Sequence, residues 1–463
     1  MAESQVEQHS NLSTILLVLR ITSVLYQWFS VLLVVLGRCV DINRKNIINE
    51  DLEKNFLYKF IKKYVFMWLI FAGCIVSVCG AESASAAVQS DYDKLKTKVI
   101  KAYKEYKTEL DIGAFEFYIN DDKSSIKDIM TEVVNKTPSL FYTNHSYSLE
   151  YNTLNGKIVN IQLGYASEYK NSSGNVNESA IKKASNKINK EIKKITSQIK
   201  SGMNSVDKAL FVHDYIVKNT SYENKSSNNS RLTEYGVLVK HKGNCQGYSL
   251  AYAAVMEKLG FSVGFVNSDS MEHVWNLVKI GAKWYNIDVT WDDPVDSIRG
   301  KNQDGVVYHK YFLASDSYMK KNGHYGYEKT AAQNTNYDKS YVKSVTSAFD
   351  YSGGNWVYMN SSGIYRRRHI NSDMAKCLYK VQGKCFIKYN SIKYYYISHN
   401  RLYIFSSKSN KSALVWSPVK KYGYSYYIVQ LKCASGKIKY SVLNAKNNKV
   451  KSGSLEIKKG GFV

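Results

Sequence analysis

The sequence predicts an α+β protein, with helices and strands mixed in its first two thirds and strands alone in its last third. Three observations predict this class. Apolar residues recur at helical spacing in several segments before residue 260. Apolar and polar residues alternate from His273 to Trp291. Short alternating runs, separated by turn residues, fill the chain after Tyr341.

Length and composition indicate a folded protein of several domains. The 463 residues are too many for one ordinary core, and 44% of them are hydrophobic. We expect a mixed α+β core, preceded by a small α+β module and followed by an all-β domain. The expected boundaries are membrane or signal segments at 1–89, the module at 90–203, the core at 204–330, and a basic, Tyr-rich β domain at 331–463.

Two apolar runs open the chain. Ile15–Leu36 approaches the length of a membrane span, although Arg20 interrupts it. Val65–Gly80 follows lysines and precedes the small residues of 84–87, which is the pattern of a secretory signal peptide. The stretch 38–63 is rich in basic residues, which would keep it cytoplasmic if both apolar runs enter the membrane. Either the chain forms an anchored hairpin, or its true start lies near Leu57. Both alternatives place the rest of the chain outside the cytoplasm, membrane-anchored or secreted.

The segments after the apolar runs follow in order. Asp91–Leu110 is expected to be a helix, Phe115–Ile119, Tyr147–Tyr151 and Lys157–Tyr165 to be strands, and Glu178–Lys200 to be a basic helix. Val206–Lys218 is the next amphipathic helix, with Ser205 as its expected cap. On it, His213 and Asp214 are neighbours in sequence, so we expect their side chains to point apart and to serve the structure.

Cys245 is expected to begin a helix. The apolar residues after it recur at helical spacing up to Leu259, and Gly260 is placed where a helix ends. The unsatisfied N–H groups at a helix start favour a thiolate over a thiol and supply part of an oxyanion site. Gly243 and Gly247 are expected to let a substrate backbone approach closely. A lone buried cysteine is more often a small apolar residue, so Cys245 needs a base nearby to count as a nucleophile.

A predicted β-hairpin supplies that base. The runs 273–279 and 284–291 both alternate, and a tight turn at residues 280–282 joins them. If the turn is centred between Ile280 and Gly281, His273 and Asp288 lie opposite each other on one face. A carboxylate there would orient the imidazole and stabilise its charged form, as the third member of a catalytic triad does.

The motifs that carry Cys245, His273 and Asp288 resemble those of the bacterial transglutaminase-like superfamily. The resemblance covers roughly residues 205–315, including a helix at 212–217 and a strand at 311–313, and its motifs are Tyr235-Gly236, Gly243–Ser249, Glu272–Asn276 and Trp284–Pro294. It implies a papain-like core with Cys245 as nucleophile, His273 as general base and acid, and Asp288 as the orienting acid. Asn244 departs from the small apolar residue expected before the cysteine.

Four further residues are candidates for the oxyanion site or the substrate cleft. They are Tyr235, Gln246, Trp275 and Trp291, and for each of them simple packing is the competing interpretation. A Cys/His/Asp trio also suits zinc, but no H-E-x-x-H or C-x-x-C spacing is present, and we expect neither a metal nor a cofactor.

The C-terminal part is basic and rich in strands. From Ala331 to Val463 there are 23 Lys and Arg against 4 Asp and Glu, which predicts a polyanionic partner. Because the chain is expected to be exported, that partner is an anionic cell-envelope polymer or lipid surface, and no nucleic acid is expected. The segment 315–340 is expected to be a polar connector. Cys377, Cys385 and Cys433 are either buried thiols, or Cys377 and Cys385 pair across a hairpin.

These observations together predict an exported cysteine enzyme that acts on amide bonds of proteins or peptides through a thioester. Attack by water on the thioester gives a cysteine peptidase or amidase, and attack by an amine gives transglutaminase-type cross-linking. The two alternatives stay open, with peptidase or amidase favoured. The competing hypothesis is a catalytically silent module of the same fold that binds the cell surface through its basic β domain.

Overall fold

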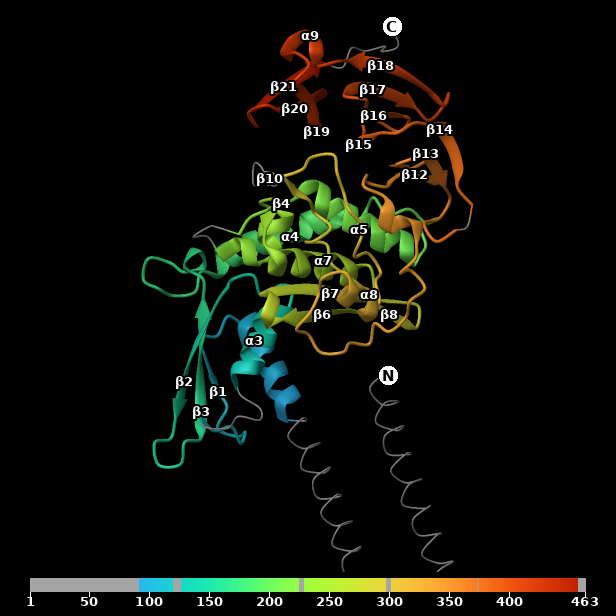
Figure 1. Ribbon diagram of the computed structural model, residues 1–463. Helices are drawn as coiled ribbons and strands as arrows, with labels where there is room; N and C mark the ends of the chain where they lie inside the picture. The colour runs from blue at the N-terminus through green and yellow to red at the C-terminus, as the bar shows by residue number, and fades with distance from the viewer. Residues whose placement is uncertain (1–90, 120–125, 225–228, 297–300, 373, 457–463) are drawn as a thin grey trace, which may run out of the picture. The chain divides into compact units, whose positions relative to one another are not determined.

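The computed structural model describes residues 91–456 except 120–125, 225–228, 297–300 and 373 (Figure 1). The chain divides into two compact units, 1–87 and 88–463. The expected membrane or signal segments lie outside the described residues, and the finer domain boundaries stay a prediction. None of the helices that the structure describes combines the length and the apolar character of a membrane span.

The described chain opens with a small sheet and its helices. Residues 91–104 are helical, and β1 (Glu109–Asp111), β3 (Ile158–Tyr165) and β2 (Thr143–Tyr151) form an antiparallel sheet in that order. The strand expected at Phe115–Ile119 is reduced to a single bridge between Tyr118 and Lys157. Two helices complete this part, α3 (Ile126–Lys136) and α4 (Glu178–Thr196). The isoleucines of α4 are buried because they recur on one helical face.

Helices packed on a three-stranded sheet form the central core. The helices are α5 (Ser205–Asn219), α6 (Glu234–Leu238) and α7 (Cys245–Lys258). The antiparallel sheet has the order β6 (Val263–Ser268), β7 (His273–Ile280), β8 (Lys283–Ile287). In Figure 1, α7 lies along this sheet, with α4 and α5 beyond it. Two short strand pairs complete the core, β4 (Ser221–Tyr222) with β5 (Lys242–Gly243) and β9 (Val295–Asp296) with β10 (Lys301–Asn302).

Capping residues set the helix ends. The cap of α5 is Asn204 rather than Ser205, because Asn204 and Asp207 form a reciprocal capping box. At the C-terminal end of α7, Gly260 has a φ of +85°, in agreement with the expected helix end. Residues 311–313 form a turn instead of the expected strand, and only Ala314 forms a bridge, with Asn286. The expected connector contains another capped helix, α8 (Asp316–Lys321).

The C-terminal part is all β, as expected. Three antiparallel sheets follow one another in sequence, and within each sheet every strand pairs with the next one along the chain. The first sheet contains β11 (Asp350–Ser352), β12 (Asn355–Asn360), β13 (Gly363–Arg367) and β14 (Lys376–Lys380). The second contains β15 (Lys384–Lys388), β16 (Lys393–Ser398), β17 (Arg401–Ser406) and β18 (Lys411–Trp416). After the short α9 (Val419–Tyr422), the third contains β19 (Tyr426–Ala434), β20 (Lys437–Asn444) and β21 (Val450–Glu456).

Side chains between the sheets join them to each other and to the central core. One apolar cluster, with Phe386 and Tyr394, fills the space between the first and second sheets, and another, with Ile404 and Val442, lies between the second and third. On the opposite face of the first sheet, Trp356 belongs to the central core. The suggested Cys377–Cys385 disulfide is wrong: both thiols are free, on β14 and β15 of different sheets.

Candidate active site

Cys245 is the first residue of α7. The side-chain oxygen of Asn244 accepts a hydrogen bond from the Gly247 amide at 3.3 Å, so Asn244 is the N-cap of the helix. This explains the polar residue that departs from the family pattern. Cys245 is 9% exposed, and its sulfur donates to the carbonyl oxygen of Glu272 at 3.9 Å. The thiol therefore lies at a helix start beside the first residue of β7.

The two glycines near Cys245 serve the packing of the chain itself. A Cβ atom on Gly243 would collide with the side chain of Val237, and one on Gly247 would collide with the carbonyl oxygen of Arg231. The prediction that they admit a substrate backbone is therefore not needed to explain them. They allow the segments before α7 to approach closely.

His273 lies between the sulfur and Asp288. Its Nε2 atom is 2.7 Å from Oδ2 of Asp288, and both side chains are buried. The remaining ring nitrogen, Nδ1, is then the one available to Cys245. Burial alone would lower the pKa of His273. The charge and hydrogen bond of Asp288, together with the hydrogen bond and charge of Cys245, raise this pKa to about 10. The site therefore favours an imidazolium beside the sulfur.

The hairpin that carries His273 has a register two residues away from the expected one. Ile280 pairs with Lys283 and Asn276 pairs with Ile287, so the turn is Gly281-Ala282. Gly281 has a φ of +59°, which suits glycine at the start of a two-residue turn. Asp288 follows the last residue of β8 and reaches His273 diagonally. A shift of two residues leaves every side chain on its expected face, because strand side chains alternate with a period of two.

Asp288 accepts three hydrogen bonds. Its Oδ1 atom accepts from the Trp291 amide at 3.0 Å, and Oδ2 accepts from His273 and also from Nε2 of His324 at 2.8 Å. Burial alone would raise the pKa of Asp288. The charge of His273 and the hydrogen bonds from both imidazoles hold it well below its usual range. The carboxylate is therefore ionised and held at both oxygens.

His324 is the residue of this site that the sequence did not suggest. It lies in the segment expected to be a polar connector, shortly after α8, and is 0% exposed. The only signal was a histidine among several tyrosines, and nothing in that pattern gives a distance to Asp288.

Trp275 and Trp291 surround the imidazole of His273. Their rings stack on it at centroid distances of 5.7 and 5.5 Å. Trp275 is buried and its indole nitrogen donates to Oδ1 of Asn286 at 2.8 Å, which makes it part of the core. Trp291 is 40% exposed and forms a wall at the surface side of the triad. An exposed aromatic wall of this kind suits contact with a substrate.

Gln246 and Tyr235 contact other parts of the chain. The side-chain amide of Gln246 donates to the carbonyl oxygen of Asn135, so it points toward the N-terminal module. The ring of Tyr235 stacks on Phe141 at 6.0 Å, and the Lys240 ammonium lies 5.5 Å from its centroid. These contacts tie residues 135–141 to the start of α7 and to α6, and they favour the packing interpretation for both residues.

A second buried histidine–aspartate network lies next to the triad. His213 and Asp214 do not point apart as expected, since Nδ1 of His213 lies 2.8 Å from Oδ1 of Asp214. Nε2 of His213 contacts Asp292 at 3.2 Å, and Nε2 of His309 contacts Asp214 at 2.9 Å. Burial lowers the pKa of His213, but both carboxylates raise it, to about 9 overall. The network joins α5 to the segments around residues 292 and 309, which is a structural role.

Both histidine–aspartate groups contain side chains of the kinds that bind metals. The two trios, His213/Asp214/His309 and His273/Asp288/His324, bring their ligand atoms within 4.8 Å of one another. In each trio both imidazoles direct a nitrogen at the same carboxylate oxygen at 2.7–2.9 Å. Direct hydrogen bonds of this length leave no space for an ion between the partners. The donor geometry therefore fits hydrogen bonding and not a metal.

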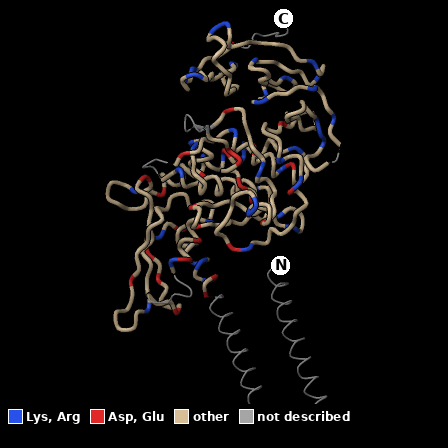
Figure 2. The backbone as a smooth tube through the Cα atoms, in the orientation of Figure 1, with Lys and Arg blue, Asp and Glu red and all other residues tan. Residues whose placement is uncertain are grey.

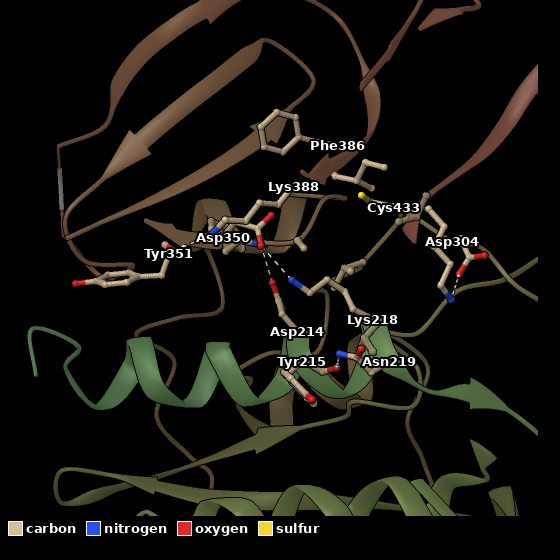
Figure 3. Close-up of a pocket in the computed structure, with 18 of the residues that line it drawn as sticks. Asp214, Tyr215, Lys218, Asn219, Asp304, Asp350, Tyr351, Phe386, Lys388 and Cys433 are labelled. Carbon is tan, nitrogen blue, oxygen red and sulfur yellow. Dashed lines mark hydrogen bonds and ion pairs between the residues drawn. The ribbon is translucent and has the colours of Figure 1, made fainter. Parts of the chain in front are cut away.

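A large cavity lies away from the triad. It has a volume of about 760 Å³ and is lined by α5, β11 and β15 (Figure 3). Lys218 lies 3.1 Å from Asp350 across it, and Lys388 donates to the carbonyl oxygen of Tyr351 at 3.0 Å. Cys245, His273 and Asp288 are not among its lining residues. The cavity is therefore separate from the proposed chemistry.

Comparison with known proteins supports the identity of the central core. Residues 193–289 match the family model of the transglutaminase-like superfamily, and no curated protein matches the chain. Among solved structures, a crystal structure of a TGase is 18% identical, with a TM-score of 0.24, over 48% of this chain and 60% of that chain. The N-terminal domain of Nup159 is 5% identical, with a TM-score of 0.18, over 42% of this chain and 44% of that chain. The chain thus spans less than two thirds of either structure, and similarities this weak say nothing about activity.

Proposed function

Because residues 193–289 form a transglutaminase-like core, we propose that this chain is an exported cysteine-nucleophile enzyme that acts on amide bonds of proteins or peptides. The observation that carries the proposal is the arrangement of Cys245 at a helix start, beside an imidazole that is itself bound to a buried carboxylate. A nucleophile, a base and an orienting acid in this order are the parts that acyl transfer needs.

The proposed reaction has two steps. The Cys245 sulfur attacks the amide carbonyl carbon, a C–S bond forms, and the first amides of α7 stabilise the negative charge on the oxygen. The imidazolium of His273 then gives its proton to the leaving amine nitrogen, and the C–N bond breaks to leave a thioester. Asp288 stabilises the imidazolium throughout. In the second step, His273 takes a proton from the attacking water or amine, a C–O or C–N bond forms at the acyl carbon, and the C–S bond breaks to return the Cys245 thiolate and the His273 imidazolium.

The attacking molecule decides between hydrolysis and cross-linking. Water gives a peptidase or amidase, and a lysine amine gives an isopeptide bond. We propose hydrolysis as the main reaction, because Cys245 and His273 are each only 9% exposed and water is a smaller nucleophile than a lysine side chain for so buried a site.

The alkylation rates of two cysteines of the same chain test the nucleophile. Cys245 is 9% exposed, whereas Cys377 is exposed and serves as an internal reference thiol. Native protein is treated with iodoacetamide near neutral pH, and each peptide is quantified by mass spectrometry. We expect Cys245 to react faster than Cys377 despite its burial, and to lose this advantage in His273→Ala and in urea. A Cys245 that reacts more slowly than Cys377 would contradict the proposal.

The basic β region supports a second, independent function, attachment to an anionic polymer of the cell envelope. Figure 2 shows Lys and Arg distributed over the C-terminal sheets with few acidic residues among them. Exposed lysines occur on all three sheets, for example Lys376, Lys411 and Lys439. A surface of one charge attracts a polyanion by long-range electrostatics, which salt screens.

Binding to polyglutamate tests this second function. We expect the full chain to bind the polymer at low salt and to release it as salt rises, and we expect Lys376→Glu/Lys411→Glu/Lys439→Glu to bind less. Three exposed lysines of the N-terminal part, Lys104, Lys127 and Lys183, give the matched control when changed to Glu. Equal loss in both triple variants would show attraction by net charge alone and would remove the β region from the proposal.

A further inference from the structure

One carboxylate oxygen of the triad is shared by two imidazoles. Oδ2 of Asp288 lies 2.7 Å from Nε2 of His273 and 2.8 Å from Nε2 of His324. The ring centroids of the two histidines are 5.9 Å apart, with an interplanar angle of 51°, so they reach this oxygen from different directions. The proposed triad uses His273 alone, which leaves the second imidazole without an assigned role.

Aromatic rings hold His324 in a fixed orientation. Its centroid lies 4.3 Å from that of Trp291, 4.7 Å from that of Tyr311 and 4.8 Å from that of Trp275. The side chain is 0% exposed. A ring packed on several sides has lost its rotamer freedom before it meets Asp288, so its N–H bond has a fixed direction.

The hydrogen-bond partners of His324 assign its tautomer. Nε2 faces the Asp288 carboxylate, and Nδ1 has no hydrogen-bond partner among the described residues. If Nδ1 alone carried the hydrogen, this N–H would be unpaired in a buried site. The lone pair of Nε2 would also face a lone pair of Oδ2 of Asp288, which is repulsive. The Nε2–H tautomer avoids both costs. His324 is therefore a rigid donor aimed at one oxygen atom.

We propose that His324 is a positioning residue that fixes the orientation of the Asp288 carboxylate and thereby the bond between Asp288 and His273. The proposal concerns the same site as the proposed function and rests on it. Without His324, His273 is the one described side chain that holds Oδ2, and among the described residues only the Trp291 amide holds Oδ1. Rotation of the carboxylate about its Cβ–Cγ bond would then lengthen the contact that stabilises the imidazolium.

The charged and titratable neighbours of Asp288 come from several elements. They are His273 on β7, His324 after α8, Tyr222 on β4, Tyr311 in the turn after residue 309, and Cys245 across His273. The hydroxyl of Tyr311 donates to the carbonyl oxygen of Asn322 at 2.7 Å. Of this set, His273 and His324 donate side-chain hydrogen bonds to the carboxylate. If substitution of His324 changes the pKa of His273, the change therefore reports on the Asp288 carboxylate that both histidines share.

The direction of that change separates positioning from a simple electrostatic effect. A donor that only withdraws charge from Asp288 would, when removed, leave a stronger acceptor and raise the pKa of His273. A donor that positions the carboxylate would lower this pKa when removed, because an opposite charge raises it by about 1–3 units only while it stays close. A residue that only fills space would leave it unchanged.

Nitrogen NMR of the full-length chain with ¹⁵N-labelled histidine measures this quantity without a substrate. The His273 signal is assigned by its absence in His273→Ala. His324→Phe keeps the aromatic packing and removes the donor, and His324→Gln restores an N–H at a similar position. Tyr327→Phe is the matched control, because its ring also packs on Trp275, at 4.9 Å, and its hydroxyl donates to the carbonyl of Asp316.

We expect the pKa of His273 to fall by about one unit or more in His324→Phe, to recover in His324→Gln, and to stay unchanged in Tyr327→Phe. If His324→Phe does not fold, the comparison of His324→Gln with His324→Met replaces it. An unchanged or raised pKa in the donor-free variant, or an equal fall in Tyr327→Phe, overturns the proposal. If Cys245 is unreactive but the pKa of His273 falls as expected, the proposed enzyme activity is contradicted and the positioning role of His324 is supported. If the enzyme is active but the pKa of His273 does not fall in His324→Phe, only the positioning role of His324 is contradicted.

Discussion

Single contacts at the residue scale decide the chemistry of the site. Asn244 caps the helix that presents Cys245, and Asp288 binds the imidazole beside the sulfur. In the sequence Asn244 departs from the family pattern, yet an asparagine before a helix is a preferred cap. The proposed roles of Cys245, His273 and Asp288 were predicted from residue type, spacing and the resemblance to the transglutaminase-like superfamily. His324 did not, because its contact with Asp288 depends on the path of an irregular segment.

Replacement of the orienting acid should reduce the reactivity of the thiol. In Asp288→Asn the amide keeps the size of the side chain and removes its charge, so the pKa of His273 should fall from about 10 toward its ordinary value. We expect acyl transfer to slow by about 10²–10⁴-fold, the range typical of a lost acid–base partner. Single-turnover kinetics measure the effect. Asp304→Asn, in an exposed ion pair with Lys432, is the control, and equal rates in both variants would contradict the role of Asp288.

At the scale of elements, polar contacts join the N-terminal part of the described chain to α6 and α7. Glu234 at the start of α6 accepts from the amide of Ser139 at 2.7 Å, and Gln246 on α7 donates to the carbonyl of Asn135. The periodicity of the sequence predicted the helices and strands on both sides of this contact. It did not predict the contact itself, since periodicity describes each element alone. For the same reason the sequence predicted the correct face for each side chain of the hairpin, while the observed pairing of its strands differs from the predicted one by two residues.

Glu234 should make the stability of this contact depend on pH. Burial raises its pKa from 4.5 to about 7, although the Ser139 amide lowers it in part. Folding therefore takes up a proton at Glu234 between these pH values. The contribution of Glu234 to stability is greatest below pH 4.5 and falls by about 3 kcal/mol in total as pH rises to 7. Urea unfolding at pH 5 and pH 7.5 measures the difference. Glu234→Gln should remove about half of the difference, because the raised pKa values of His273 and His213 also make stability fall above pH 6.5. An undiminished pH dependence in this variant would contradict the prediction.

At the scale of the whole described unit, the β sheets and the central core share buried contacts. Asp207 of α5 accepts from the indole nitrogen of Trp356 at 2.9 Å and from the Ile370 amide at 2.8 Å. Short alternating runs predicted an all-β region. They did not predict that one face of the first sheet packs against the central core. Alternation shows that a strand has two faces, but it does not show which part of the protein each face contacts.

Loss of the Trp356 donor should therefore destabilise α5 as well as the sheet. In Trp356→Phe, Asp207 keeps its other partners but loses one buried hydrogen bond, and we expect a cost of about 1–3 kcal/mol together with lost packing. Hydrogen exchange followed by mass spectrometry reports on α5 and on β12 separately. Trp284→Phe, at a partly exposed site, is the control. Faster exchange in β12 with α5 unchanged would contradict the shared contact.

The most direct test of the proposed enzyme is the capture of its thioester. Full-length protein is mixed with a library of glutamine- and lysine-containing peptides, quenched in acid within the first turnover, and digested for mass spectrometry. The account predicts an acyl adduct on the Cys245 peptide, absent in Cys245→Ser and strongly reduced in His273→Ala. An adduct that forms equally in these variants, or peptides that are cleaved without any adduct on Cys245, would contradict it.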